Sequence, residues 1–78
     1  MEPNVFLENF KKQFIDGDKL EIAMKTEFRQ IESYDSLTGM TIIVMIKDEY
    51  NVDITDNEYK SQKSINDLFN LIQSKLKT

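Results

Sequence analysis

Apolar residues recur at helical spacing near the start of the chain, where phenylalanine stands at every fourth position. Phe6, Phe10 and Phe14 would share one face of a helix. Asn4 is a residue type that caps the amino ends of helices, and the sequence at 16–18, Asp-Gly-Asp, is typical of a helix stop. The pattern predicts a first helix capped by Asn4 that buries its three phenylalanines in the core.

The middle of the chain holds its longest uncharged stretch, residues 37–46. The β-branched centre of this stretch would suit a buried strand, but its flanks favour a helix. Asp35 and Ser36 are both common amino-terminal caps, and Asn51 can take the left-handed conformation that ends a helix. We therefore predict a second helix between these caps. Gly39 would cost this helix about 1 kcal/mol relative to alanine, and close approach by a partner is one explanation for its small size.

Two further helical segments follow. Thr55 is a suitable cap for a short helical turn through Tyr59, and residues 60–63 read as a polar link. Ser64 would cap a last helix, with Asp67 placed favourably in its first turn. Apolar residues recur in that helix at positions 65, 68, 69, 71, 72 and 76. The expected fold is all-α, a bundle of three main helices plus one short helix, with a long, partly helical loop between the first and second helices.

Composition and charge exclude several functions. Seventy-eight residues suffice for one domain, expected to span residues 1–78. The chain has no Cys and no His, so it lacks disulfides, the usual zinc ligands, and the base of a serine hydrolase triad, and we expect no enzymatic activity. The net charge of −4 argues against binding nucleic acid.

The location of the chain and its oligomeric state are also expectations. The start of the chain lacks a cationic targeting region, and no apolar stretch is long enough to insert into a membrane. We expect a cytoplasmic monomer. Asp53, Asp56 and Glu58 lack the spacing of a calcium loop, so no metal site is predicted.

Acidic residues concentrate in one part of the chain. Residues 32–58 contain seven acids and one lysine. Such a segment can steer a basic partner, although a run of charge is more often only a solvated face. The acids are Glu32, Asp35, Asp48, Glu49, Asp53, Asp56 and Glu58.

The sequence around Ser36 resembles the acyl carrier protein family. Asp35-Ser36-Leu37 opens the predicted apolar helix, which ends Lys47-Asp48-Glu49-Tyr50 and is followed by Val52-Asp53-Ile54 and then Asp56-x-Glu58. The resemblance covers nearly the whole chain. It includes the Phe-rich first helix, the aromatic Phe28 in the loop, and the last helix opening at Ser64-Ile65.

The resemblance implies that Ser36 is the attachment point for 4′-phosphopantetheine, transferred from coenzyme A by a separate Mg²⁺-dependent phosphopantetheinyl transferase. Asp35 would help to hold the metal or basic groups of that transferase, and Leu37 would lie beside the arm. The arm would supply the thiol that this chain lacks. Acyl-loading and acyl-processing enzymes would be the other partners, in fatty acid synthesis or in a specialised pathway such as polyketide, aminoacyl or modified-lipid synthesis.

The start of the second helix departs from many carriers, which have acidic residues there. The side chains at this place are neutral, so docking is expected to rely more on packing than on charge. The expected partner-binding residues are Thr38, Met40, Thr41, Asp48, Glu49 and Asp56.

Two alternatives stay open. Carriers can hold acyl chains by parting their helices; a closed core with the cargo outside is the other arrangement. The residues that would line such a cavity are Phe28, Met40, Val44, Met45, Ile54 and Leu68.

A different class of function is an unmodified helical interaction module, which would bind a basic partner through the acidic 32–58 face while Ser36 serves only as a helix cap.

Overall fold

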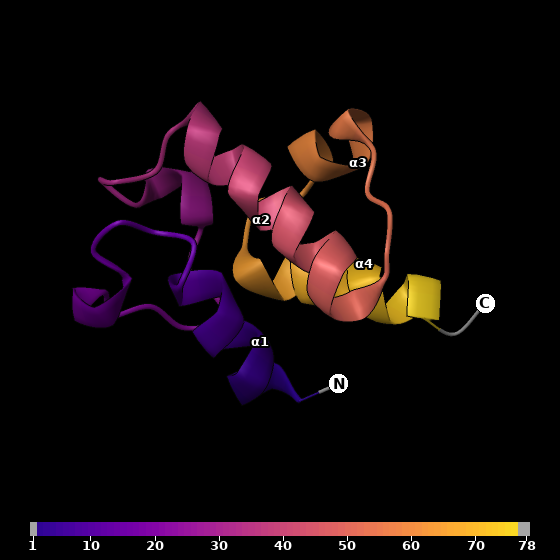
Figure 1. Ribbon diagram of the computed structural model, residues 1–78, viewed down its shortest axis with the longest axis horizontal. Coiled ribbons are helices and arrows are strands. Elements are labelled where there is room, and N and C mark those ends of the chain that lie inside the picture. Colours follow the sequence, from indigo (N-terminus) through magenta and orange to yellow (C-terminus); the bar gives the residue numbers. More distant parts are fainter. Residues whose placement is uncertain (1, 77–78) are drawn as a thin grey trace.

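The computed structural model describes residues 2–76, which fold into four α-helices with no β-strand among them. The helices are α1 (Pro3–Lys11), α2 (Ser36–Tyr50), α3 (Asp56–Ser61) and α4 (Ile65–Leu76). Two short 3-10 turns, Gly17–Lys19 and Phe28–Gln30, lie in the long connection between α1 and α2. In Figure 1, α2 runs through the middle of the molecule, with α1 and α3 on opposite sides of it and α4 behind it. The predicted bundle of three main helices, one short helix and a long loop is confirmed.

The helix ends from α2 onward agree with the capping residues expected from the sequence. Asp35 caps α2, and Asn51 ends it in the left-handed conformation, at φ 56°. Thr55 and Glu58 form a reciprocal capping box at the start of α3. Helix α3 runs to Ser61, so it takes up part of the segment predicted as a polar link.

The last helix starts in the same way. The Ser64 hydroxyl accepts a hydrogen bond from the Asp67 backbone N–H, and the Asp67 carboxylate accepts one from the Ser64 N–H. Hydrogen bonds to the backbone N–H groups of Ser64 and Lys63 lower the pKa of Asp67. The start of α4 is also tied to the long loop, because the Ile65 N–H donates to the Thr26 carbonyl at 3.0 Å.

The prediction for the first helix was wrong at both ends. Glu2 occupies the cap position without a side-chain hydrogen bond, and Pro3 is the first helical residue, so Asn4 is not the cap. Proline suits this position because the first N–H of a helix has no partner within the helix. At the other end α1 stops at Lys11, where the backbone tightens, and the Phe14 N–H bonds the Lys11 carbonyl. This turn still carries Phe14 into the core.

Gly17 explains why the chain can leave the helix so tightly. A Cβ atom at this position would lie 2.0 Å from the Lys11 carbonyl oxygen, a distance that no side chain can adopt. The residue therefore has to be glycine for the loop to fold back against the end of α1.

The core is aromatic on the side of α1 and aliphatic between α2 and α4. The ring of Phe6 lies 5.7 Å from that of Phe69, and the ring of Phe10 lies 5.6 Å from that of Phe28, in the range of favourable edge and tilted contacts. The side chains that are fully buried are Phe6, Phe10, Phe28, Ile42, Ile46, Ile65, Leu68 and Ile72. None of the helices in residues 2–76 has the length and apolar character needed to cross a membrane.

The six residues proposed as a cavity lining do not surround one space. Met40 and Val44 are exposed on the surface of α2, at 64% and 57%. The other four, Phe28, Met45, Ile54 and Leu68, are packed in the hydrophobic core.

Candidate functional site

The amino end of α2 is held by Asp35. One oxygen of its carboxylate accepts hydrogen bonds from both the backbone N–H and the hydroxyl of Thr38, each at 2.8 Å. These two bonds lower the pKa of Asp35, so the carboxylate is ionised at neutral pH. A negative charge at this end also interacts favourably with the helix dipole. The first turn of α2 therefore has a fixed geometry.

Ser36 is the first helical residue, and it takes no part in the cap. Its side chain is exposed, and its hydroxyl has no hydrogen-bond partner among residues 2–76. Both Asp35 and Ser36 were candidates for the cap, and the structure gives that role to Asp35 alone. The helix-cap explanation therefore accounts for Asp35 but leaves the accessible hydroxyl of Ser36 without a structural role.

This position suits a covalently attached phosphate. A phosphodiester on the Ser36 oxygen would lie at the amino end of a 15-residue helix, where the unpaired N–H groups and the helix dipole favour negative charge. Leu37 next to it is 66% exposed and offers an apolar surface to whatever is attached. The residues present therefore fit an attached phosphopantetheine arm.

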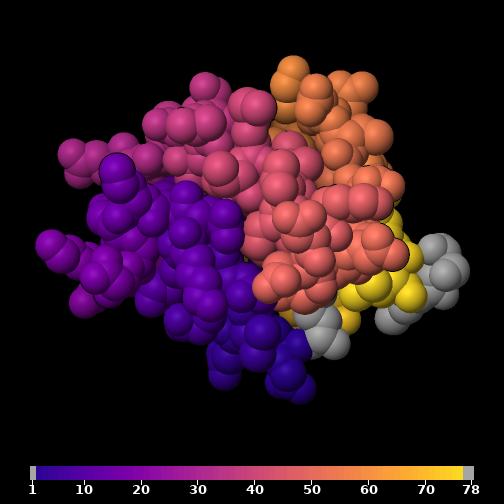
Figure 2. Space-filling model, in the orientation of Figure 1, coloured from indigo at the N-terminus to yellow at the C-terminus, as the bar shows by residue number. Residues whose placement is uncertain are grey.

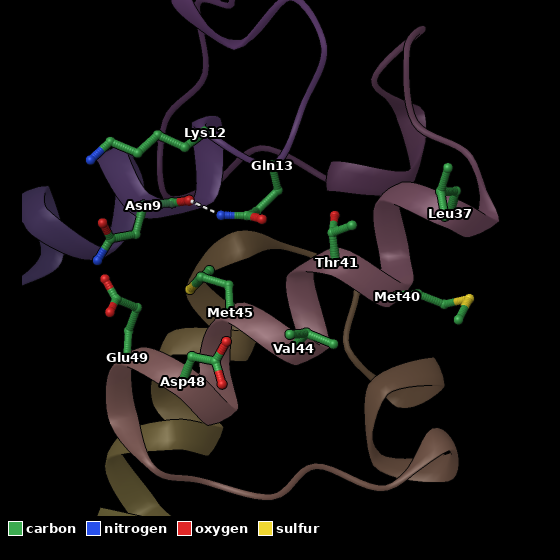
Figure 3. Close-up of a pocket in the computed structure, with 10 residues that line it drawn as sticks. All are labelled: Asn9, Lys12, Gln13, Leu37, Met40, Thr41, Val44, Met45, Asp48 and Glu49. Atoms are coloured by element: carbon green, nitrogen blue, oxygen red, sulfur yellow. Dashed lines mark hydrogen bonds between the residues drawn. The ribbon is translucent and has the colours of Figure 1, made fainter.

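A surface groove runs along α2 from Leu37 toward its carboxyl end (Figure 3). It encloses about 540 Å³ between α2 and residues 9–13. Its α2 side presents exposed Leu37, Met40 and Val44, and in Figure 2 atoms of α2 cover the middle of the visible face. A groove with this lining offers apolar contact area to a partner.

The wall opposite α2 in this groove was not foreseen. The Gln13 side chain donates to the Asn9 carbonyl at 2.9 Å, and Asn9 donates to the Tyr50 hydroxyl at 3.0 Å. Lys12 stands at the same wall and brings a positive charge to it. No spacing rule in the sequence relates residues 9–13 to α2, so only the packing of α1 against α2 reveals this wall.

The structure brings most of the predicted partner-binding residues together in this groove. Met40, Thr41, Asp48 and Glu49 all line it, together with Leu37, which was predicted to lie beside the arm. Two others lie apart and have different surroundings.

Thr38 and Asp56 are the two that lie apart. Thr38 is 8% exposed and donates its hydroxyl to Asp35, so its contacts are those of the helix cap. Asp56 is exposed at the start of α3, beside a second hollow that also contains Ser36.

The acidic segment 32–58 does not form one free face. Asp53 pairs with Lys47 at 3.2 Å, and Glu58 pairs with Lys75 at 2.8 Å. The hydrogen bond from Lys75 is the main reason why the pKa of Glu58 is lowered. Within residues 2–76 no three acidic side chains converge as metal ligands would. The acids that stay outside these two ion pairs lie at Glu32, at the two ends of α2 and at the start of α3, and these remain to attract a basic partner.

Tyrosine and arginine side chains near Ser36 were also missed. The hydroxyl groups of Tyr34 and Tyr59 lie 2.8 Å apart, and the Arg29 guanidinium packs against the Tyr59 ring. These residues are up to 30 positions apart in the chain, so no local pattern predicts their contact. The one available signal was that Arg29 is the single arginine of the chain and directly follows the buried Phe28.

An accessible serine at the amino end of the second helix of an all-α bundle is suited to carry a covalently attached group. Residues 15–72 match the family model described as a phosphopantetheine attachment site. Because the match spans well over half of the chain, this protein belongs to the phosphopantetheine-binding family. Domains of this family carry 4′-phosphopantetheine covalently and are themselves non-catalytic.

Proposed function

We propose that residues 1–78 form one carrier unit that holds acyl intermediates as thioesters on a 4′-phosphopantetheine arm attached to Ser36. The unit presents these intermediates to partner enzymes in fatty acid synthesis or in a specialised acyl pathway. The observation that carries this proposal is the Ser36 hydroxyl, which is exposed, takes no part in the cap, and lies inside the segment matched by the family. The bound arm supplies the thiol, which is absent from the chain.

In the loading reaction this chain supplies only the serine hydroxyl that is modified. The Ser36 oxygen would attack the phosphorus of coenzyme A that bears the pantetheine, forming a phosphodiester and breaking the bond to the remaining nucleotide. The transferase would provide the base that takes the serine proton and the Mg²⁺ that stabilises the leaving phosphate. The absence of histidine from the chain is therefore no obstacle to its role.

Asp35 has two tasks in this proposal. Its hydrogen bonds to Thr38 fix the first turn of α2 and so fix the position of Ser36. Its ionised and exposed carboxylate also stands next to the serine, where it can meet the metal or a basic group of the transferase. Thr38 acts through Asp35.

Partner enzymes would dock on the groove along α2. Leu37 and Met40 provide apolar contact area near the arm, and Thr41 continues this neutral surface. Asp48 and Glu49 at the far end of the groove, and Asp56 on α3, would attract basic groups on the partner. Packing would dominate in the groove next to Ser36, and charge would act at the far end of the groove and on α3.

The test is intact-protein mass after incubation with coenzyme A, Mg²⁺ and a broad-specificity phosphopantetheinyl transferase. The parent chain should gain the mass of one phosphopantetheine, and Ser36→Ala should gain none. Ser74→Ala, which removes another exposed helical serine, is the matched control and should load like the parent. Folded parent protein that stays unmodified, while a known carrier is loaded in the same tube, would contradict the proposal.

A further inference from the structure

A second hollow opens beside Ser36, on the side of α2 that faces α3. It encloses about 440 Å³. Ser36, Gly39 and Ile43 line it from α2, and Tyr59 lines it from α3, together with Tyr34 from the preceding loop. A group attached to Ser36 would therefore meet this α2–α3 hollow first if it turned toward the core.

The inner boundary of the α2–α3 hollow is a pair of tyrosines. The hydroxyl oxygens of Tyr34 and Tyr59 are 2.8 Å apart, and the Tyr59 ring lies 5.6 Å from that of the fully buried Phe28. Burial, aided by the hydrogen bond with Tyr34, raises the pKa of Tyr59, so its hydroxyl stays neutral. The two rings thus fill the space between the hollow and the core.

Gly39 shows how closely this pair fits against α2. A Cβ atom on Gly39 would lie 2.6 Å from the Tyr34 hydroxyl oxygen and 3.4 Å from that of Tyr59. The small residue in the first turns of α2 is therefore explained by contact within the chain. The absence of a side chain at Gly39 lets the two tyrosine hydroxyls pack directly against α2, with no space left between them and the helix.

Arg29 fastens Tyr59 from the other side. Its guanidinium carbon lies 4.8 Å from the centre of the Phe28 ring and 4.9 Å from that of Tyr59. The same guanidinium donates to the backbone carbonyl of Tyr59 at 2.6 Å and to that of Gln62. These charge-assisted hydrogen bonds tie α3 to the loop turn Phe28–Gln30, so Tyr59 cannot move away from Phe28 without breaking them.

Building on the proposed function, we propose that Tyr34 and Tyr59 close the route between α2 and α3, so that cargo on the Ser36 arm stays outside the core. A long alkyl chain would then lie on the surface of the protein, partly exposed to water, which is less favourable than full burial. The cargo class that fits is a short or polar acyl group.

The experiment compares two loaded forms of the protein. The transferase transfers the phosphopantetheine part of coenzyme A analogues that bear an amide-linked acetyl or octanoyl group, and mass confirms loading. The two forms of the parent should melt within about 1 °C of each other, with unchanged amide NMR shifts at Ile46 and Leu68 of the core. A parent octanoyl form that melts several degrees higher and shifts those amides would overturn the inference.

Variants test whether Tyr59 is the residue that keeps the octanoyl group out of the core. In Tyr59→Ala, or in Tyr59→Leu if the alanine variant does not fold, octanoyl should raise the melting temperature over acetyl by about 4 °C or more. Tyr50→Ala removes the same side chain from the far end of α2 and should show no octanoyl effect. An octanoyl effect absent from the Tyr59 variants would refute the role of the tyrosine pair. Failure of both groups to load on the parent, while a known carrier is loaded with them in the same tube, would instead refute the proposed function.

Discussion

Replacing Gly39 with alanine is a sensitive test of the packing beside Ser36. Alanine is the better helix former by about 1 kcal/mol, so an open site would become more stable. Here the new Cβ atom would lie 2.6 Å from the Tyr34 hydroxyl oxygen, and that side chain is held by its hydrogen bond to Tyr59. Overpacking of this kind costs about 1–3 kcal/mol. The expected net result for Gly39→Ala is a loss of about 1 kcal/mol, or roughly 4–8 °C in melting temperature.

The double-mutant cycle with Tyr34→Phe isolates this contact. Removing the hydroxyl leaves ring carbon Cζ as the nearest Tyr34 atom, at 3.5 Å, which is ordinary van der Waals distance. In the Tyr34→Phe background, Gly39→Ala should therefore stabilise the fold by up to about 1 kcal/mol, because only its helix propensity remains. The sign of the effect reverses between the two backgrounds, a coupling of about 2 kcal/mol.

Urea unfolding followed by circular dichroism at the helix band measures all four proteins of the cycle. The free energy of unfolding of each protein comes from linear extrapolation to water. If Gly39→Ala changes that free energy equally with Tyr34 and with Phe at position 34, the close packing of the tyrosine pair on α2 is wrong.

Three further outcomes are expected. Arg29→Met should lower the free energy of unfolding by about 2 kcal/mol, because two backbone carbonyls at the end of α3 lose a charged donor. Urea unfolding measures this, and an unchanged midpoint would contradict the role of Arg29 in holding α3. The pKa values of Asp35, Glu58 and Asp67 are lowered in the fold, so their stabilisation is complete above the unfolded pKa and is lost as pH falls through the folded values. The melting temperature should therefore drop below about pH 4, and a constant value down to about pH 2.5 would refute this. Added NaCl should raise the melting temperature at pH 7, because the chain has a net charge of −4, and a midpoint that does not respond to salt would count against this repulsion.

Local rules predicted much of the fold because several helix ends depend on residues close together in the chain. The caps at Asp35 and Asn51 fix the limits of α2 despite its β-branched centre. The pair Ser64 and Asp67 does the same for the start of α4. The prediction for the first helix failed because it took Asn4 as the cap from its residue type alone, whereas proline at the first helical position sets the start.

The surroundings of the candidate site were less predictable. The sequence pattern indicated Asp35 and Ser36 as candidate site residues because the start of a helix is a local feature. The contact between Tyr34 and Tyr59 joins residues 25 positions apart and depends on how α3 packs against α2. Gly39 stood out in the sequence as an unfavourable helix residue, and close approach by a partner was one explanation; the structure shows that the close contact is with Tyr34 and Tyr59.

The central claim is that Ser36 itself carries the arm, and mapping the modification tests it most directly. Trypsin should release residues 30–47 as one peptide, since Arg29 and Lys47 bound a stretch without other cleavage sites. This peptide also contains Ser33, Tyr34, Thr38 and Thr41, so fragment masses have to distinguish five hydroxyls. After loading, the phosphopantetheine mass should appear on Ser36 alone. A modification on another residue, or none with an active transferase, would contradict the account.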